Sequence, residues 1–114
     1  MKYSLFIDDE RNPEDVTWMD LSEIWKHPVT IARSMEQVED IVRNVGFPAF
    51  ISFDHDLGEK EPTGKDIANW LIGCDLDNDS MPSDFSYCVH SKNPVGKENI
   101  QGLLDSYLLF KEHQ

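Results

Sequence analysis

The sequence predicts an α/β fold, a small three-layer sandwich built around a mostly parallel four-stranded sheet. Short apolar runs that suit buried strands alternate with longer segments whose apolar residues recur at helical spacing. Alternation of this kind is typical of parallel strands joined by right-handed crossovers. The length of 114 residues, without an internal repeat or a linker, predicts a single domain over residues 1–114.

The predicted strands are four short apolar runs, each followed by polar or turn-forming residues. They cover residues 2–7, 29–32, 47–53 and 85–90. Pro28 and Gly46 interrupt the chain before the second and third of these runs. Residues 58–62 are polar and residues 75–84 are acidic with a proline among them, so both segments are expected to form surface loops.

The predicted helices are the amphipathic segments between the strands. A short one covers residues 20–26, and a second follows Ser34, which we expect to form a capping box with Gln37. A third covers residues 63–73, and the last covers residues 94–111. The resulting order is strand, short helix, strand, helix, strand, helix, strand, helix.

Composition limits the classes of function. The net charge of −12 disfavours binding to a nucleic-acid backbone, which requires lysine and arginine. It leaves open a metal-loaded acidic site, or a protein partner whose basic surface meets an acidic one. No apolar stretch approaches the roughly 20 residues that span a membrane, and the first residues show neither the apolar region nor the cleavage site of a signal peptide. Cys74 and Cys88 are expected to be reduced thiols, so the sequence predicts a cytoplasmic protein.

Two acidic clusters follow predicted strands, Asp8-Asp9-Glu10-Arg11 and Asp54-His55-Asp56. In a parallel α/β sheet, ligands bind outside the carboxyl ends of the strands. Crowded carboxylates repel one another unless a cation lies among them, and a hard divalent metal takes oxygen ligands. We therefore expect Mg²⁺, or another divalent metal, on Asp8, Asp9, Asp54 and Asp56. The alternative is that these residues are solvated acids of two loops.

A third polar cluster, His90-Ser91-Lys92-Asn93-Pro94, lies at the end of the last predicted strand. The pKa of an unperturbed histidine lies near neutrality, so His90 is the expected general acid or base. Ser91 and Asn93 carry a hydroxyl and an amide that suit phosphate oxygens, and the helix start at Pro94 favours an anion. Alternatively, His90 is a buried core residue, and Ser91 or Asn93 caps the helix.

Further phosphate ligands are expected at the same edge of the sheet. Thr63 and Gly64 open a helix whose backbone N–H groups and hydroxyl could hold a phosphate, although a plain helix cap explains them equally well. Arg11 and Lys92 are the expected cationic partners of a bound anion, and Arg11 could instead pair with the neighbouring acids.

These motifs, in this order, resemble the cyclic-phosphate processing receiver-like domain family, a compact relative of the receiver domains of response regulators. The matching runs are Phe6 to Pro13, Ser52 to Gly58, Thr63 to Asp66 and His90 to Gly96. The resemblance implies a truncated receiver/flavodoxin-like fold and a role in processing cyclic phosphates on nucleotides, such as ADP-ribose cyclic phosphate. It also implies a site made of Asp8, Asp9, Asp54 and Asp56, joined by His90, Ser91 and Asn93. Receivers that act in phosphorelays need a lysine after a fifth strand, and this chain predicts only four strands.

The leading hypothesis is a metal-dependent phosphoesterase acting on a small phosphorylated nucleotide. Asp8, Asp9 and one of Asp54 and Asp56 would hold the metal, and the remaining carboxylate would position water or attack phosphorus. His90 would protonate the leaving oxygen, while the side chains of Ser91, Lys92 and Asn93 would hold the phosphoryl oxygens. Two other hypotheses are a non-catalytic protein that sequesters a nucleotide and an acidic protein-interaction module.

Overall fold

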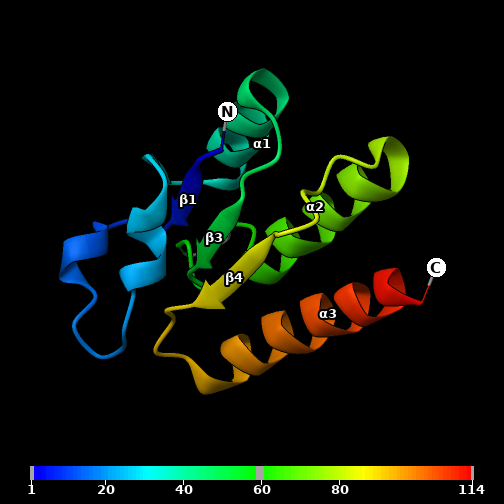
Figure 1. Ribbon diagram of the computed structural model, residues 1–114. Coiled ribbons are helices and arrows are strands. Elements are labelled where there is room, and N and C mark those ends of the chain that lie inside the picture. The colour runs from blue at the N-terminus through cyan, green and yellow to red at the C-terminus, as the bar shows by residue number, and fades with distance from the viewer. Residues whose placement is uncertain (1, 59–60, 114) are drawn as a thin grey trace.

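The computed structural model describes residues 2–58 and 61–113. One sheet contains β1 (Ser4–Ile7), β2 (Val29–Ala32), β3 (Phe50–Phe53) and β4 (Ser86–Val89). The strand order is β2-β1-β3-β4, and all three pairings are parallel (Figure 1). The predicted α/β class with a parallel four-stranded sheet is confirmed, although the ends of three predicted strands lie outside the sheet.

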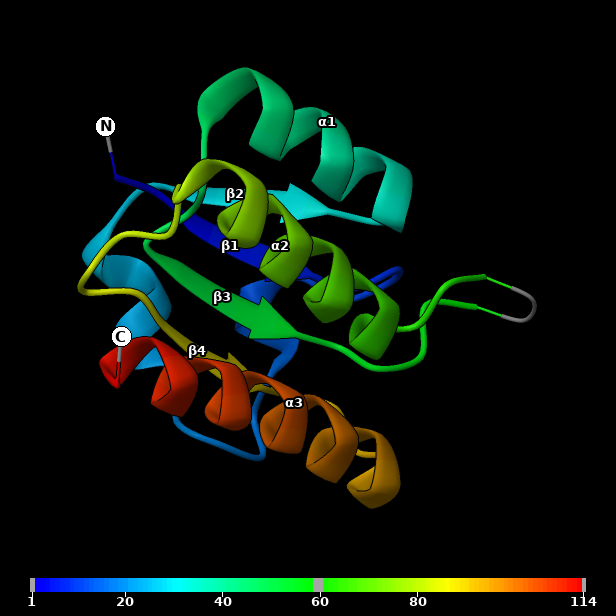
Figure 2. The ribbon, with the colours of Figure 1, turned by 90° about the vertical axis from the view of Figure 1, so that its right-hand side faces the viewer.

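Three helices cover one face of this sheet (Figure 2). They are α1 (Met35–Val45), α2 (Gly64–Asn78) and α3 (Pro94–Glu112), and they pack on the main core around Leu5, Ile51 and Val89. The opposite face is covered by residues of two 3-10 turns and their loops, η1 (Pro13–Asp15) and η2 (Ser22–Lys26). The third layer of the predicted sandwich is therefore present but consists of short turns.

The chain adds β2 on one side of β1, and then β3 and β4 on the other side, so the direction of strand addition reverses between β1 and β3. The chain passes from β1 to β2 over the turn-covered face, and from β2 to β3 over the helical face. Neighbouring strands whose connections leave to opposite sides open a crevice beyond their carboxyl ends, where ligands bind in α/β proteins. The acidic clusters after β1 and β3 meet at this crevice, as the sequence predicted.

The helix caps follow the predicted residues with one difference. The hydroxyl of Ser34 accepts a hydrogen bond from the backbone N–H of Gln37 at 3.2 Å. The side chain of Gln37 accepts from the N–H of Arg33 at 2.6 Å, so the reciprocal half of the predicted capping box is absent. The full box forms at α2 instead, between Thr63 and Asp66.

The prediction that residues 75–84 form a surface loop is wrong for the first four of them, because α2 continues to Asn78. Asp75 is buried and accepts hydrogen bonds from Tyr107 and Lys111 of α3, both at 2.5 Å. Burial alone would raise the pKa of Asp75, but these donors lower it below its usual value. The predicted loop at 58–62 includes residues 59 and 60, which lie outside the described residues.

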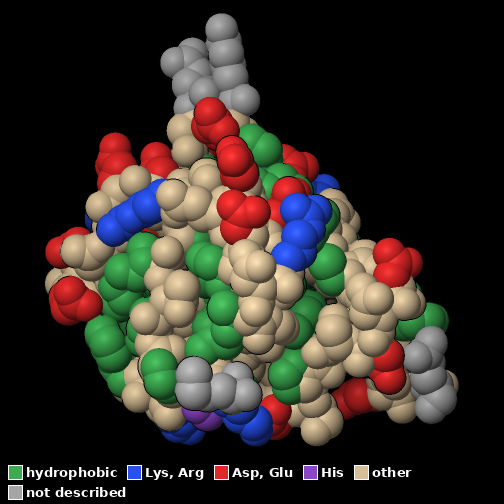
Figure 3. All heavy atoms as spheres, turned by 90° about the horizontal axis from the view of Figure 1, so that it is seen from above, with side chains coloured by type: hydrophobic (Ala, Val, Ile, Leu, Met, Phe, Trp, Pro, Cys, Tyr) green, Lys and Arg blue, Asp and Glu red, His purple; other side chains and the backbone are tan. Residues whose placement is uncertain are grey.

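On the face shown in Figure 3, hydrophobic side chains lie in the middle and acidic side chains are scattered mostly around the edge. None of the described helices is long and apolar enough to cross a membrane. The described cysteines, Cys74 and Cys88, are both free thiols, as predicted.

Two helices begin in direct contact with the segment that follows β3. A Cβ atom on Gly64 would overlap the carbonyl oxygen of Asp54, and one on Gly96 would overlap the ring of His55. Glycine at these positions lets the first turns of α2 and α3 pack directly against residues 54–56. This packing helps to fix the position of Asp54.

Alanine substitutions should separate these two glycines from the others in the helices. Gly64→Ala and Gly96→Ala are expected to lower the free energy of unfolding by about 1–3 kcal/mol or more, the cost of overpacking. A Cβ atom on Gly73 or Gly102 would lie in open space, so alanine there should stabilise the helix by about 0.5–1 kcal/mol. Urea unfolding of the four variants measures these changes in the free energy of unfolding. Equal changes at all four positions would contradict the prediction.

Candidate functional site

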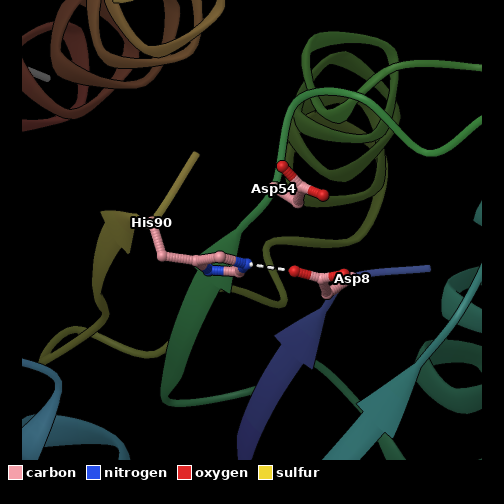
Figure 4. Close-up of side chains that lie close together, drawn as sticks. All are labelled: Asp8, Asp54 and His90. Atoms are coloured by element: carbon pink, nitrogen blue, oxygen red, sulfur yellow. Dashed lines mark hydrogen bonds and ion pairs between the residues drawn. The ribbon is translucent and has the colours of Figure 1, made fainter. Parts of the chain in front are cut away.

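The carboxyl ends of β1, β3 and β4 bring three side chains together, those of Asp8, Asp54 and His90 (Figure 4). The side chains of Asp8 and His90 are inaccessible to solvent, and Asp54 is only 5% exposed. One potential ligand atom from each of the three lies within 4.8 Å of the others. They form a buried group that could bind a metal ion.

Asp8 is held by hydrogen bonds on both carboxylate oxygens. Oδ1 accepts from the backbone N–H groups of Glu10 and Arg11, each at 2.9 Å, and Oδ2 lies 3.0 Å from Nε2 of His90. Burial would raise the pKa of Asp8, but these interactions outweigh it and lower the pKa to about 2. Asp8 is therefore a carboxylate with a fixed orientation.

Asp54 lies in a less favourable environment. Its Oδ1 accepts a hydrogen bond from the N–H of His55 at 2.9 Å. Burial raises the pKa of Asp54, and the neighbouring negative charge of Asp8 raises it further. Two carboxylates that disfavour each other's charge would both be stabilised by a cation between or beside them.

An open pocket of about 510 Å³ lies in front of these carboxylates. It is lined by residues from all three clusters that the sequence singled out: Asp9, Glu10, Arg11, Asp54, Asp56, Gly58, Ser91, Lys92 and Asn93. The predicted metal ligands Asp9, Asp54 and Asp56 thus share one pocket with four of the predicted phosphate ligands, Arg11, Ser91, Lys92 and Asn93. Asp8 and His90 lie behind it. The mixture of carboxylates with two cationic side chains suits an anion that binds together with a metal.

The polar residues after β4 differ in how much of their hydrogen-bonding capacity is used. Asn93 caps α3 by accepting from the N–H of Gly96 at 3.1 Å, and its Nδ2 donates to Asp56 at 3.2 Å. The hydroxyl of Ser91 accepts from the N–H of Asn93 at 3.1 Å, so its own hydrogen can be donated to a ligand. A hydrogen bond with Nδ1 of His55 lowers the pKa of Asp56 below its usual value.

Thr63 and Gly64 are not brought into this pocket. The hydroxyl of Thr63 takes part in the capping box with Asp66, and the N–H of Gly64 donates to the carbonyl of His55 at 2.8 Å. Their observed role is the helix cap, which was the alternative interpretation of these two residues in the sequence.

His90 is enclosed on every side by described atoms. Its Nδ1 lies 2.6 Å from the hydroxyl of Ser52, and its ring stacks on Phe6 with 4.5 Å between ring centroids. Both ring nitrogens are therefore engaged, and no part of the side chain reaches the pocket. The general-acid role of His90 stays a prediction, and this geometry favours a role that His90 exerts through Asp8.

Trp18 is a site residue that the sequence did not predict. Its indole N–H donates to the carbonyl of His90 at 2.9 Å, a contact between residues 72 positions apart. The cationic groups of Arg11 and Lys92 lie 5.1 Å and 4.3 Å from its ring centroid, within the range of a cation–π interaction. Trp18 thereby holds two cations of the pocket at its rim.

Arg33 is the second residue that was not predicted. Its guanidinium donates to the backbone carbonyls of Asp8 and Arg11, at 3.2 Å and 2.5 Å, and to the side chain of Asn12 at 2.6 Å. It fixes the turn that carries the first acidic cluster. A signal was present in the sequence, because Arg33 follows β2 at the same edge of the sheet.

Comparison with known proteins identifies a family and a similar fold. A sequence model described as "Cyclic-phosphate processing Receiver domain" matches residues 3–106. The chain belongs to this family. No curated protein matches it. Among solved structures, a fusion described as containing the yeast Spc42 trimeric coiled coil is similar in fold. That chain has 18% identity and a TM-score of 0.57, and the match covers 98% of this chain and 82% of the other.

Membership of the cyclic-phosphate processing receiver family confirms the resemblance seen in the sequence. The family name suggests involvement in cyclic-phosphate processing. The structural likeness, at such low identity, concerns the fold alone. The site of this family member therefore has to be interpreted from its own residues.

The donor chemistry of the site fits a hard divalent metal. The carboxylates of Asp9, Asp54 and Asp56 border the pocket, and Asp8 lies directly behind them. Oxygen ligands of this kind suit Mg²⁺, which keeps several waters and therefore needs an open site. A nitrogen ligand would favour a softer metal, but both nitrogens of His90 are already engaged.

Proposed function

We propose that this chain is a metal-dependent phosphoesterase that processes a cyclic phosphate on a small nucleotide, such as ADP-ribose cyclic phosphate. One observation carries the proposal: carboxylates from the ends of neighbouring strands share a pocket with Arg11 and Lys92. A pocket lined only by carboxylates would repel a phosphate, and a pocket that binds phosphate through cationic side chains alone would have no use for carboxylates. Their combination is what a metal-bound phosphate requires.

The carboxylates divide into two roles in this proposal. Asp8, Asp9 and one of Asp54 and Asp56 would hold Mg²⁺. When bound, the metal neutralises and orients the phosphate. The other of Asp54 and Asp56 would position the attacking water or attack phosphorus itself, since carboxylates can form covalent intermediates.

The substrate phosphate binds on the side of the pocket that faces α3. Arg11 and Lys92, held by Trp18, supply positive charge, and Ser91 supplies a hydroxyl donor. The N-terminus of α3, which begins at Pro94, adds a partial positive charge. Asn93 contributes through Asp56, to which its amide donates.

A non-catalytic nucleotide-binding protein is the second candidate. The observation that favours it is the burial of His90, because no histidine is among the described residues that line the pocket. The acidic interaction module, by contrast, gains no support from the face in Figure 3, where the acidic side chains are scattered. A protein partner stays a prediction.

Hydrolysis assays test the proposal directly. The wild-type protein is expected to open nucleotide cyclic phosphates, including ADP-ribose cyclic phosphate, in the presence of Mg²⁺ and to lose this activity with EDTA. The reaction is followed by ³¹P NMR, in which the cyclic ester and its product have separate signals. Stabilisation of the protein by the same compounds, without turnover, would instead select the binding function. If these compounds are neither hydrolysed nor able to stabilise the protein, with or without metal, both the catalytic and the binding function are contradicted.

A further inference from the structure

Trp18 lies exposed at the rim of the pocket and belongs to neither hydrophobic core. Its side chain leaves the residue 36% accessible to solvent. The residues Val16 and Leu21 of the same loop are buried in the core on the turn-covered face, whereas Trp18 packs into neither that core nor the one below the helices. Core packing therefore does not account for a large aromatic side chain at this position.

The orientation of the indole ring is fixed through its edge. The indole N–H donates to the carbonyl of His90 at 2.9 Å, which ties the ring to the end of β4. The next two residues of the chain, Ser91 and Lys92, line the pocket. Because this hydrogen bond uses only the edge of the ring, the π-faces of the indole remain available for other partners.

The partners of the ring face are the cationic groups of Arg11 and Lys92, which lie 5.1 Å and 4.3 Å from its centroid. Both side chains also line the pocket, and both are accessible to solvent, so they can turn toward a bound anion. A phosphate oxygen is a stronger partner for either cation than an aromatic ring, because charge-assisted hydrogen bonds exceed exposed cation–π contacts. A phosphate in the pocket would therefore draw these cations from the ring and open its face to another flat group.

The base of a nucleotide is a flat group that arrives together with the phosphate. Every base has a π-face, and proteins bind unpaired bases by stacking them on aromatic side chains. In a nucleoside cyclic phosphate, the base and the phosphate are attached to one ribose. A base can then lie on the ring of Trp18 while the phosphate contacts the two cations beside it.

We propose that Trp18 is a specificity-determining residue whose ring stacks on the base of a nucleotide, while Arg11 and Lys92 bind its phosphate. The inference rests on the proposed function, because it requires a phosphate in this pocket. It adds a substrate class: the site prefers cyclic phosphates that carry a base to those that carry only a sugar. The preference applies equally to an enzyme and to a protein that only binds its nucleotide.

Two ligands that differ in the base test the proposal. Adenosine 2′,3′-cyclic phosphate and methyl β-ribofuranoside 2′,3′-cyclic phosphate are compared in the presence of Mg²⁺ by their Kd values, or by kcat/KM if they are hydrolysed. The wild type is expected to prefer the base-bearing ligand by about 5- to 150-fold, the contribution of one stacked base. Equal values in the wild type overturn the inference and leave the proposed function standing. If neither ligand binds or reacts, both are overturned.

Variants of Trp18 separate stacking from a structural role. Trp18→Leu removes the aromatic face and should abolish the preference between the two ligands. Trp18→Phe keeps a ring face but loses the N–H that bonds with the carbonyl of His90, and it should retain most of the preference.

Trp25→Leu is the matched control. Trp25 is a 56% exposed tryptophan on η2, and no cation of the described residues lies over its ring. This variant should keep the preference of the wild type. A folded Trp18→Leu protein that weakens both ligands by the same factor would show that Trp18 acts only on the structure of the rim, and it would refute the proposal.

Discussion

Asp54→Asn is expected to stabilise the metal-free protein and to abolish its further stabilisation by Mg²⁺. Asparagine has nearly the same shape and still accepts the hydrogen bond from the N–H of His55. It removes a buried negative charge that the charge of Asp8 disfavours, as the raised pKa of Asp54 shows. A gain of about 1 kcal/mol corresponds to a rise of about 4 °C in Tm for a domain of this size.

The same substitution is expected to lower turnover of a nucleotide cyclic phosphate by at least about 10²-fold, the usual loss when one preorganised charge-stabilising group is removed. Asp77→Asn is the matched control, because it removes the same charge from an exposed position of α2 that does not line the pocket. It should leave both the Mg²⁺ response and turnover as in the wild type. Thermal unfolding with and without Mg²⁺ measures the first effect. Identical metal responses in the wild type and Asp54→Asn would contradict the role of Asp54 as a metal ligand.

The fold could be predicted from local signals because those signals agree with one another. Apolar runs gave the four strands, and the caps at Ser34, Thr63 and Asn93 gave the starts of three helices. The C-terminal end of α2 could not be predicted, because Asp75 resembles a loop residue in sequence. It is helical because Tyr107 and Lys111, more than 30 residues away, satisfy its buried carboxylate.

The site was predictable to the extent that strand ends define it. Asp8, Asp54 and His90 follow three strands that the sequence shows, and parallel strands bring their carboxyl ends to one edge. Trp18 acts through a contact between distant segments, and its spacing carries no local signal of that contact. Arg33 also contacts a distant segment, and its place after β2 was the signal that could have identified it. Burial of His90 also depends on tertiary packing, since Phe6 and Ser52 enclose it from neighbouring strands.

Substitutions of His90 should separate a positioning role from a general-acid role. His90→Ala removes the ring that stacks on Phe6 and leaves Asp8 without its donor. The resulting cavity and unpaired buried carboxylate are expected to lower the free energy of unfolding by about 3 kcal/mol. Turnover should fall by about 10²-fold or more, and Mg²⁺ should stabilise the variant less than it stabilises the wild type.

His90→Gln provides the discriminating comparison. The amide nitrogen of glutamine reaches about as far as Nε2 of histidine, so it can still donate to Oδ2 of Asp8, but it cannot exchange a proton near neutral pH. A positioning role predicts that glutamine restores the Mg²⁺ stabilisation and keeps turnover within about 10-fold of the wild type, since outer-shell changes to a metal site typically cost about 10–100-fold. A general-acid role predicts that both variants lose turnover equally while His90→Gln binds metal normally. Measuring kcat and the Mg²⁺-dependent Tm shift on the two folded variants distinguishes these outcomes, and the Tm shift does so even for a protein that only binds its nucleotide.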